Sequence, residues 1–543
     1  MYTRVSTQHA PPQRTTDMDM PPLFDLSLSE REETLEEQPQ TEAAAVAPPR
    51  PARVNPQTVA AASQVAAGSI GSVLASAAMA ATAPAPSAVA VAAAASSAPH
   101  SQLHNFQLSA PPPSASLDFP PEFAGADDPD EDLYGTRMSL PSFVSSILAS
   151  PRALSDRAGF ELELLQNLAA APEVQNQIYR EATIIPEMMK KNRYSNVIPN
   201  RASRVILPSA SSNPADSYIN ACSMPPLLAG SIQPYIACQA PLPHTLSDFW
   251  HMVWTQQTAL IVMLTKTAER DARGNVIHKA HSYWPESPQE QAAANGGQAS
   301  KGKEDSLPSV RFAPYTVTLL STHQEPDLII RELLLTYDGG VDGGADDVNA
   351  PPPRHVHQLQ YTGWPDFGVP DDSDPTKGFV RIFTLYRAIR NHLHQQHQAA
   401  AAAAGAEGAA GGEGAGKSVS ASSSAASASS LSAPPTSAAP LPAPIIVHCS
   451  AGIGRSGVWI AVDSLLDHLT MHTAAGSLPS AYVDMFALVR RMRQSRQGML
   501  QTKEQYAYVL HFVATCMQKQ LFGVDEKAVA MQLAAAAAAG KKK

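Results

Sequence analysis

Residues 445–457 read Ile-Ile-Val-His-Cys-Ser-Ala-Gly-Ile-Gly-Arg-Ser-Gly, and their pattern predicts the centre of the fold. The β-branched run at 445–447 is typical of a buried strand. Gly452 and Gly454 then allow a tight loop, and after Arg455 apolar residues recur at helical spacing. A strand, a glycine-bearing loop and a helix N-terminus together form a concave nest of N–H groups, which predicts a site for an anion.

A cysteine opens this loop and an arginine closes it. No Lys-Ser/Thr pair follows the glycines, as it would in a nucleotide-binding loop. A helix N-terminus with a nearby arginine lowers the pKa of a thiol, and arginine grips two phosphate oxygens at once. The loop is therefore predicted to hold a phosphate over Cys449 and to favour a phosphocysteine intermediate. The competing interpretation, Cys449 as a small buried apolar residue, does not account for the order of the glycines, Arg455 and Ser456.

The run from His448 to Gly457 resembles, without interruption, the signature loop of the cysteine-dependent, tyrosine-specific protein phosphatases. The resemblance implies an α/β fold in which helices flank a twisted, mixed central sheet. It also implies chemistry without a metal or other cofactor, because an arginine and the loop amides supply the positive field. The substrate-binding residues that it implies in this loop are Ser450, Ala451, Gly452, Ile453, Gly454 and Arg455, with His448 in support.

Residues 364–370 read Trp-Pro-Asp-Phe-Gly-Val-Pro and follow a predicted strand at 355–361. An aspartate beside proline and glycine is ordinarily a turn residue. However, a tyrosyl leaving group needs a proton, which a carboxylic acid on a closable loop can donate. Because these residues match the acid loop of the family, the sequence favours Asp366 as general acid, with Trp364 packing on the hinge side.

Residues 191–197 resemble the substrate-recognition loop of the family. The resemblance places Tyr194 in the wall of a pocket deep enough to exclude phosphoserine, although an exposed surface tyrosine is the alternative. Asn196 stands where the family usually has aspartate, which leaves the peptide preference of this chain open.

Residues 501–506 resemble the family block that orients the hydrolytic water. Gln501, supported by Gln505, inherits that role from the resemblance, and Ser456 is expected to stabilise the departing thiolate.

Charged residues beside the motifs allow two interpretations. The resemblance gives Glu269 and Lys279 the role of bracing the catalytic arginine and the acid loop, whereas surface charges on a hairpin are the alternative. The arginine-rich end of the predicted helix 481–492 either complements the helix dipole or attracts acidic phosphopeptides.

Composition divides the chain of 543 residues, because its 47 prolines and low aromatic content (6%) do not fit a continuous core. Residues 1–140 form an Ala/Pro/Ser-rich extension that is predicted to be disordered. The predicted catalytic domain spans 141–522, and a poly-Ala/Lys tail follows at 523–543. Loop-like composition predicts low-complexity inserts at 288–306, 338–353 and 397–443.

Charge and cysteine content limit the partners and the compartment. A net charge of −10 argues against general nucleic-acid binding. The four cysteines have no metal-ligand spacing and form no disulfide framework, which indicates a reducing, cytoplasmic location. The alanine-rich residues 70–98 are not apolar enough to span a membrane. Residues Pro21–Glu37 are either a solvated acidic tail or a segment that forms a helix on a partner.

The function expected from this resemblance is hydrolysis of phosphotyrosine in proteins, with a role in signalling. Two alternatives remain. One is a catalytically silent phosphotyrosine-binding module, although the candidate nucleophile, acid and arginine are all present. The other is a dual-specificity or phosphoinositide phosphatase with a shallower pocket.

Overall fold

The computed structural model describes residues 136–170, 185–228, 231–271, 273–286, 307–338, 351–365, 368–370, 378–410, 441–474 and 481–519. Within the range 378–410, side chains are described up to residue 402. Several predictions lie outside the described residues. They concern residues 1–135 with the segment Pro21–Glu37, Asp366, the tail 523–543 and most of the three inserts.

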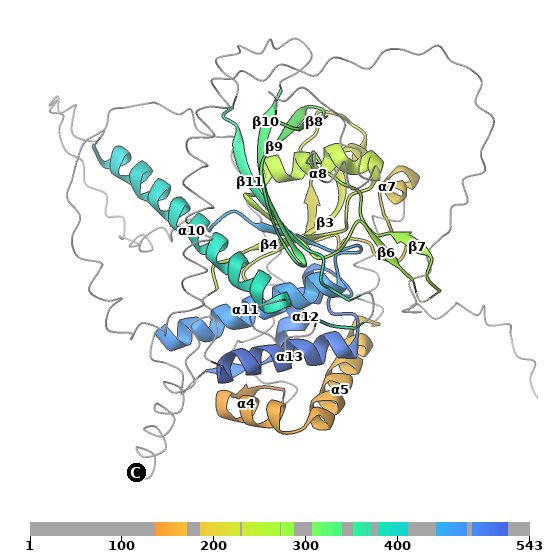
Figure 1. Cartoon of the computed structure of the whole chain (residues 1–543), viewed down its shortest axis with the longest axis vertical. Helices are drawn as coiled ribbons and strands as arrows, with labels where there is room; N and C mark the ends of the chain where they lie inside the picture. The colour runs from red at the N-terminus through yellow and green to blue at the C-terminus, as the bar shows by residue number, and fades with distance from the viewer. Residues whose placement is uncertain are drawn as a thin grey trace, which may run out of the picture. The chain divides into compact units, whose positions relative to one another are not determined.

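A mixed sheet of nine strands forms the centre of the described residues (Figure 1). Its middle strands β4, β12, β5 and β11 are parallel to one another, and the outer strands pair antiparallel. The predicted mixed sheet is thereby confirmed. In spatial order the strands are β2 (Arg204–Ile206), β3 (Tyr218–Met224), β4 (Tyr235–Cys238), β12 (Ile445–His448), β5 (Leu260–Met263), β11 (Arg354–Tyr361), β10 (Leu328–Tyr337), β9 (Tyr315–Glu325) and β8 (Ser309–Phe312).

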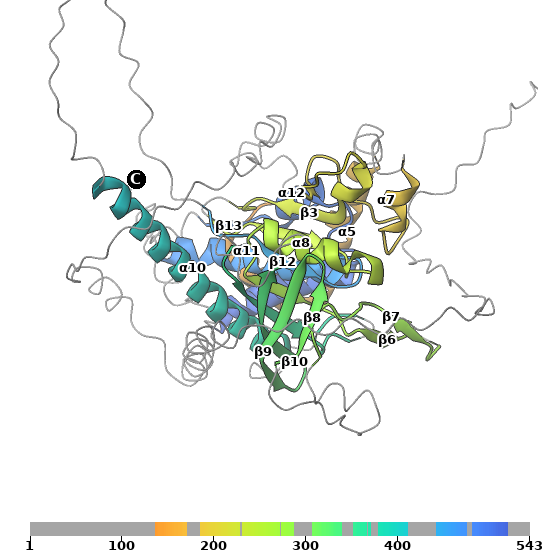
Figure 2. The same ribbon diagram turned by 90° about the horizontal axis from the view of Figure 1, so that it is seen from above.

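Helices cover both faces of the sheet, as predicted (Figures 1 and 2). Side chains alternate along the central strand β12, because successive residues of a strand point to opposite faces. Ile446 belongs to the core beneath α8 (Leu246–Thr255), whereas Ile445 and Val447 belong to the larger core on the opposite face. That larger core includes α4 (Leu140–Ala149), α5 (Pro151–Ala169), α10 (Gly378–Ala410), α11 (Gly454–Ala474), α12 (Met485–Ser495) and α13 (Lys503–Gln518).

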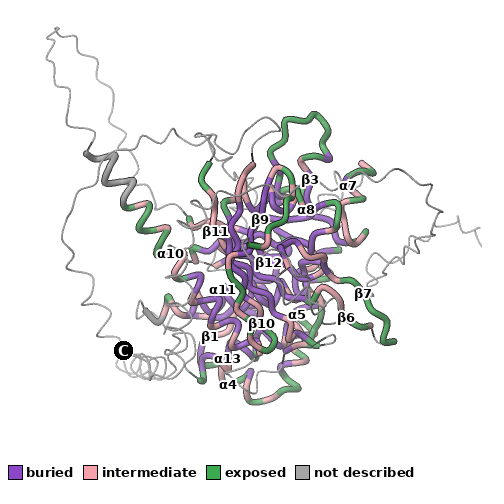
Figure 3. Tube along the Cα trace, turned by 45° about the horizontal axis from the view of Figure 1, so that its top comes forward, coloured by how far each residue is buried: buried purple, intermediate pink, exposed green. Residues whose placement is uncertain are grey.

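Shorter elements lie outside these layers. The helix α7 (Pro186–Lys190) precedes β2, and the strands β6 (Ala268–Arg270) and β7 (Val276–His278) form a hairpin. Two short helices, η1 (Pro214–Ser217) and η2 (Pro243–Thr245), precede β3 and α8, and β1 (Met138–Ser139) pairs with β13 (Tyr482–Val483). Burial is concentrated in the sheet and its helices, whereas the β6–β7 hairpin is largely exposed (Figure 3).

Local chemistry explains where several elements turn, end and begin. β8 and β9 form a hairpin that turns at Pro314, a residue without the N–H that a continuous ladder needs. The first part of the predicted insert 397–443 is helical, because α10 continues through the alanine run to Ala410 and alanine has the highest helix propensity. The helix predicted from Ala481 begins at Met485, where the Asp484 side chain accepts a hydrogen bond from the Ala487 amide at 2.9 Å.

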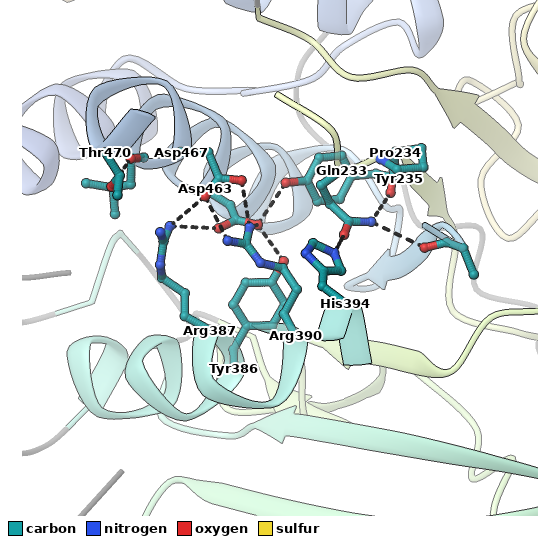
Figure 4. A network of polar contacts seen from close by, with 12 residues as sticks. Gln233, Pro234, Tyr235, Tyr386, Arg387, Arg390, His394, Asp463, Asp467 and Thr470 are labelled. Carbon is teal, nitrogen blue, oxygen red and sulfur yellow. Dashed lines mark hydrogen bonds and ion pairs between the residues drawn. The ribbon is translucent and has the colours of Figure 1, made fainter. Parts of the chain in front are cut away.

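A buried charge network joins α10 to α11 (Figure 4). Asp463 is fully buried, and its carboxylate accepts hydrogen bonds from Tyr235 Oη at 2.8 Å and from Arg390 Nη1 at 2.7 Å. Burial alone would raise the pKa of Asp463, but the charges of Arg390 and Arg387 hold it below the ordinary value. Arg390 also contacts Asp467 Oδ1 through Nη2 at 2.7 Å. These contacts fix α10 to α11, the helix that follows the loop carrying Cys449.

Candidate active site

The loop between β12 and α11 places Cys449 at its floor. The thiol is 6% exposed, and its Sγ accepts a hydrogen bond from the Gly452 amide at 3.3 Å. Burial raises the pKa of this thiol, but hydrogen bonds from the Ser456 side chain and backbone, together with the Arg455 charge, outweigh burial and lower it. Ser456 Oγ is itself buried and makes no other hydrogen bond to the described residues. Cys449 therefore lies in an environment that stabilises a thiolate.

The shape of this loop requires glycine at position 452. Gly452 has a φ of +72°, and a Cβ there would lie 2.0 Å from the Cys238 carbonyl oxygen of β4. The loop follows β4 closely, because β12 and β4 are paired up to His448 and Cys238. At the other end of the loop, the first amides of α11 have no acceptor within the helix, and they form the positive end of the helix dipole.

Arg455 is held in place by a buried carboxylate. Its guanidinium forms a two-point ion pair with Glu269, with Nη2 3.0 Å from Oε2, and Nη1 also lies 3.3 Å from the Leu264 carbonyl oxygen. Burial raises the pKa of Glu269, but the hydrogen bonds and charge of Arg455 lower it more, so the carboxylate stays ionised. Glu269 is 7% exposed and is therefore not a surface charge of the hairpin.

His448 is buried beneath the loop. Its Nε2 lies 2.8 Å from Tyr283 Oη, and its Nδ1 lies 3.0 Å from the Cys449 carbonyl oxygen. Burial lowers the pKa of His448 to about 4, so the imidazole is neutral at physiological pH. A neutral ring donates from one nitrogen and accepts at the other, which suits donation from Nδ1 to the carbonyl and acceptance from the tyrosine.

Arg496 holds the loop from the opposite side. Its side chain is fully buried, and it donates to the carbonyl oxygens of Gly452 and Ala451 at 2.9 Å and to Asn220 Oδ1 at 2.7 Å. The peptide plane whose Ala451 carbonyl accepts from Arg496 also contains the Gly452 amide, which donates to Cys449 Sγ. Arg493 lies in the last turn of α12, as predicted for a basic helix end, but it is buried and donates to the Met499 and Leu500 carbonyl oxygens. Both arginines are therefore bound within the fold.

Tyr194 lies beside the loop that carries Cys449. Its Oη is 2.7 Å from Ser450 Oγ, and Ser450 Oγ donates to the Lys279 carbonyl oxygen at 2.9 Å. Because Ser450 donates its only hydroxyl proton to the Lys279 carbonyl oxygen, the Tyr194 hydroxyl must be the donor in its hydrogen bond to Ser450 Oγ. The Lys279 side chain contributes a charge that lowers the pKa of Glu269. Asn196 is exposed.

Both ends of the acid loop are described, although Asp366 and Phe367 are not. The Trp364 ring is buried and lies 5.9 Å from the Arg455 guanidinium carbon. Trp364 Nε1 donates to the Gly368 carbonyl oxygen at 3.3 Å, so the two ends of the loop contact each other. The described ends therefore fix where the loop begins and ends, next to Arg455.

Gln501 and Gln505 cover the start of α11. A Cβ built on Gly454 would lie 2.5 Å from Gln501 Oε1 and 3.0 Å from Gln505 Nε2. The Gln501 amide donates to Gln505 Oε1 at 2.9 Å, and Thr502 caps α13 by accepting from the Gln505 amide. The Gln505 side chain is thereby held in place, and both glutamine side chains lie beside Gly454 in the loop that carries Cys449.

The predicted site residues with described side chains therefore gather around one loop, and Asn196 stands apart on an exposed turn. Within the described ranges, no group of three or more His, Cys, Asp or Glu side chains is arranged to hold a metal ion. None of the helices described has the length and apolar character needed to cross a membrane.

Known proteins with similar sequences are named as phosphatases, which agrees with the geometry of the site. The chain is 32% identical over 327 residues to mouse tyrosine-protein phosphatase non-receptor type 4, which covers 60% of this chain and 25% of that protein. It is 31% identical over 364 residues to human receptor-type tyrosine-protein phosphatase H, covering 67% and 24%. Rat phosphatidylinositol phosphatase PTPRQ is 27% identical over 350 residues, covering 64% and 11%. The chain thus spans a quarter or less of the length of these relatives.

A sequence model of one family covers most of the described fold. The model for the protein-tyrosine phosphatase family matches residues 188–402 and 418–515, which is more than half of the chain. The matched part contains the Tyr194 loop, the acid loop, the Cys449 loop and Gln501. This chain belongs to the protein-tyrosine phosphatase family.

Proposed function

We propose that this chain hydrolyses phosphotyrosine in proteins through a phosphocysteine intermediate. The observation that carries the proposal is the Cys449 thiol of lowered pKa beneath a loop whose Arg455 is held by Glu269. This pairing puts a nucleophile and a two-point phosphate ligand in one loop, which is the combination that attack on phosphorus requires.

In the first step, the Cys449 thiolate attacks the phosphorus and the bond from phosphorus to the tyrosyl oxygen breaks. The charge on the phosphoryl oxygens is stabilised by Arg455 and by the amides at the start of α11. Asp366 donates its proton to the leaving tyrosyl oxygen. The contact of Trp364 with Arg455 and Gly368 supports this assignment, because it brings both ends of the loop carrying Asp366 to the site.

In the second step, Asp366 accepts a proton from a water that attacks phosphocysteine, and the bond from phosphorus to sulfur breaks. Gln501, supported by Gln505, orients this water, which agrees with their position over Gly454. Ser456 stabilises the departing thiolate, consistent with its effect on the thiol pKa. The positive charge in both steps comes from Arg455 and the amides, so we expect no metal requirement.

Selectivity for tyrosine is supported by the position of Tyr194. Its hydroxyl is hydrogen-bonded to Ser450 of the loop, so its ring stands at the side of the site. An aromatic wall of this kind favours a phosphotyrosyl ring over the shorter phosphoserine.

Phosphoinositide hydrolysis is a second candidate, which the likeness to rat phosphatidylinositol phosphatase PTPRQ supports. We rank it below phosphotyrosine because the intact Tyr194 loop fits an aromatic ring. A silent binding module ranks below both, since Cys449 and Arg455 are present and oriented.

The deciding experiment compares matched phosphotyrosyl and phosphoseryl peptides and phosphoinositide vesicles as substrates of the full chain, with a chelator present. We expect turnover of phosphotyrosine alone, its loss in Cys449→Ser with peptide binding retained, and a large fall in kcat for Asp366→Ala. His511→Gln, an exposed change on α13, is the matched control. Equal turnover of phosphoserine, or faster turnover of the vesicles, would overturn the proposal.

We further propose that residues 141–522 are the catalytic unit and that the protein works in the cytoplasm. The first proposal is supported by the contacts of α4 and α5 with α13. These two helices precede residue 188, where the family match begins, and they pack on a helix within the match. The second rests on the cysteine content of the chain. Limited proteolysis tests the boundary, and cell fractionation tests the compartment.

A further inference from the structure

A buried arginine of the sheet holds two glutamine side chains at once. Arg331 of β10 is 1% exposed, and Gln358 and Gln360 of the neighbouring strand β11 are also buried (Figure 1). Arg331 and Gln358 are direct partners in the antiparallel pairing of these strands, and the two glutamines point to the same face because they are two residues apart. Arg331 Nη1 donates to Gln358 Oε1 at 2.8 Å and to Gln360 Oε1 at 2.9 Å.

The contacts with Arg331 determine the orientation of both amides. A guanidinium group only donates hydrogen bonds, so the atom that each glutamine presents to it must be the carbonyl oxygen Oε1. The Nε2 group of each glutamine then points to another residue, and Nε2 can only donate. The Arg331 guanidinium is itself placed by the Trp284 ring, whose centroid lies 4.2 Å from its central carbon. Two chains of hydrogen bonds with a fixed direction therefore begin at Arg331.

The first chain leads from Gln358 to the backbone of Cys449. Gln358 Nε2 donates to Tyr283 Oη at 2.9 Å, and Tyr283 Oη lies 2.8 Å from His448 Nε2. Because the tyrosine hydroxyl accepts from Gln358, its own proton is donated to His448 Nε2. The neutral imidazole then has its proton on Nδ1, which lies 3.0 Å from the Cys449 carbonyl oxygen. Gln358 thus selects the tautomer in which His448 donates to the Cys449 carbonyl.

The orientation of the Cys449 peptide depends on this tautomer. In a trans peptide the N–H points away from the carbonyl, so holding the Cys449 carbonyl also sets the direction of the Ser450 amide. Without the Gln358 amide, Tyr283 can instead accept a proton from His448 Nε2. His448 Nδ1 and the Cys449 carbonyl oxygen would then be two acceptors that face each other, and the peptide would lose its hydrogen bond.

The second chain leads from Gln360 to Arg455. Gln360 Nε2 donates to the Thr265 carbonyl oxygen at 3.1 Å, and Thr265 is 1% exposed. Thr265 Oγ1 donates to Glu269 Oε1 at 3.0 Å, and Glu269 Oε2 accepts from Arg455 Nη2 at 3.0 Å. Gln360 therefore fixes the residue that orients the carboxylate, and the carboxylate orients the guanidinium of Arg455.

We propose that Arg331 is a positioning residue for both halves of the site, acting on the nucleophile through Gln358 and on the phosphate-binding Arg455 through Gln360. This inference rests on the proposed phosphotyrosine hydrolysis, because it concerns the nucleophile and the phosphate ligand of that reaction. The two chains share Arg331 but lead to different residues of the site. Each half can therefore be disturbed by a change in the chain that supports it.

The test uses Gln358→Met and Gln360→Met in the full chain as a matched pair. Both changes keep an unbranched side chain of similar length, remove both hydrogen-bonding ends and affect a partner of Arg331 on the same strand. The first measurement is the pH midpoint of Cys449 alkylation by iodoacetamide, read from labelled peptides by mass spectrometry. The second is protection from alkylation by inorganic phosphate, which gives a Kd for phosphate at one pH above the midpoints of all variants. Neither measurement requires turnover.

The two variants should differ in which measurement changes. We expect Gln358→Met to raise the alkylation midpoint by about half a pH unit or more, because the Cys449 peptide loses its fixed orientation. The Kd for phosphate should change by less than about twofold in this variant. Gln360→Met should instead raise the Kd for phosphate about threefold or more, because Arg455 is held less rigidly, with a smaller change in the midpoint. Arg331→Met should show both changes.

A second pair of variants enters the same chains closer to the site. Tyr283→Phe removes the hydroxyl of the first chain, and Thr265→Val removes the hydroxyl of the second, with little change in shape. These variants decide the outcome for a chain whose glutamine variant does not fold. The double variant Gln358→Met with Tyr283→Phe should raise the midpoint no further than Tyr283→Phe alone, because both changes break one chain.

Equal changes of both measurements in Gln358→Met and Gln360→Met would overturn the inference, as would an unchanged midpoint in both first-chain variants. Turnover of phosphotyrosyl peptides by the unaltered chain would remain intact in either case, so the proposed function would stand. Absence of that turnover would instead contradict the proposed function, and alkylation and phosphate protection would still decide the role of Arg331.

Discussion

At the scale of single residues, Gly452 and Gly454 belong to one loop but carry different constraints. A Cβ at 452 would meet the backbone of Cys238 at 2.0 Å, whereas one at 454 would meet the end of the Gln501 side chain at 2.5 Å. A side-chain end can move at little cost, but a backbone carbonyl in a central strand cannot. The first position thus protects the shape of the loop, and the second protects the placement of the glutamine.

We expect Gly454→Ala to slow hydrolysis of phosphocysteine by about tenfold or more, because it displaces Gln501 from the attacking water. The free energy of unfolding should change by no more than about 1 kcal/mol. Rapid-mixing kinetics with a chromogenic aryl phosphate would show a burst of released phenol followed by slow turnover. Gly452→Ala is the contrasting variant, with a loss of both activity and stability. Slowing without a burst in Gly454→Ala would mean that Gln501 does not act in the second step.

A second prediction concerns the ionisation of Cys449. Because its pKa is lowered, the thiolate should be populated at pH values below the ordinary thiol pKa of about 8.5. The rate of alkylation by iodoacetamide should therefore rise with pH to a midpoint below that value. Ser456→Ala should move the midpoint upward, because it removes a hydrogen bond to the thiolate. Because all four cysteines are buried, mass spectrometry of the labelled peptides is needed to distinguish Cys449 from Cys222, Cys238 and Cys516. A midpoint at or above the ordinary value would contradict this assignment.

At the scale of elements, the network between α10 and α11 holds the helical layer together. Removing Arg390 alone leaves the buried Asp463 without its nearest cation. We expect Arg390→Met to lower the free energy of unfolding by about 3 to 5 kcal/mol, the usual cost of breaking a buried pair on one side. Urea denaturation measures this change. Arg152→Met, an exposed change on α5, is the matched control and should cost less than about 0.5 kcal/mol. A cost for Arg390→Met equal to that of the control would show that the network does not stabilise the fold.

The sequence was most informative where one local pattern determined one local structure. The strand, loop and helix around Cys449 form as the β-branched run, the glycines and the helical spacing predict. The exposed or buried state of an arginine was not predictable in this way. Arg496 is buried because Gly452, Ala451 and Asn220 meet at it in space, and those partners lie far from it in the chain. The carbonyls that need a donor have no signature of their own in the sequence.

The ends of elements were also not predictable from local patterns. Alanine-rich residues 399–410 read as a low-complexity insert, yet the helix continues into them. Alanine is frequent in low-complexity linkers and also has the highest helix propensity, so an alanine-rich composition does not distinguish a linker from a helix. By contrast, the pairing of β1 with β13 joins residues more than three hundred positions apart, which no local pattern indicates.

At the scale of the whole molecule, buried neutral histidines make stability depend on pH. Burial lowers the pKa of His357 and of His448 to about 4, against about 6.5 in an unfolded chain. Between these values the unfolded chain binds more protons than the folded one, so stability is lost as the pH falls. We expect the free energy of unfolding of the full chain to fall by on the order of 1 to 3 kcal/mol between about pH 6.5 and about pH 5. His357→Gln should reduce the slope, whereas Arg152→Met, an exposed change on α5, should not. A flat profile over this interval would mean that neither histidine is buried in its neutral form.

The central position of β12 has a consequence for how the chain can be divided. This strand lies between β4 and β5, and it belongs to the segment 441–519 that carries Cys449, Arg455 and Gln501. Tyr194, Glu269 and both ends of the acid loop precede residue 411. A break between residues 411 and 440 would therefore give two fragments, each with an incomplete site, and the first would have a slot in its sheet that only β12 fills. We expect two such fragments, expressed separately, to regain the proposed phosphatase activity only on reassembly, which would make them the basis of a complementation reporter.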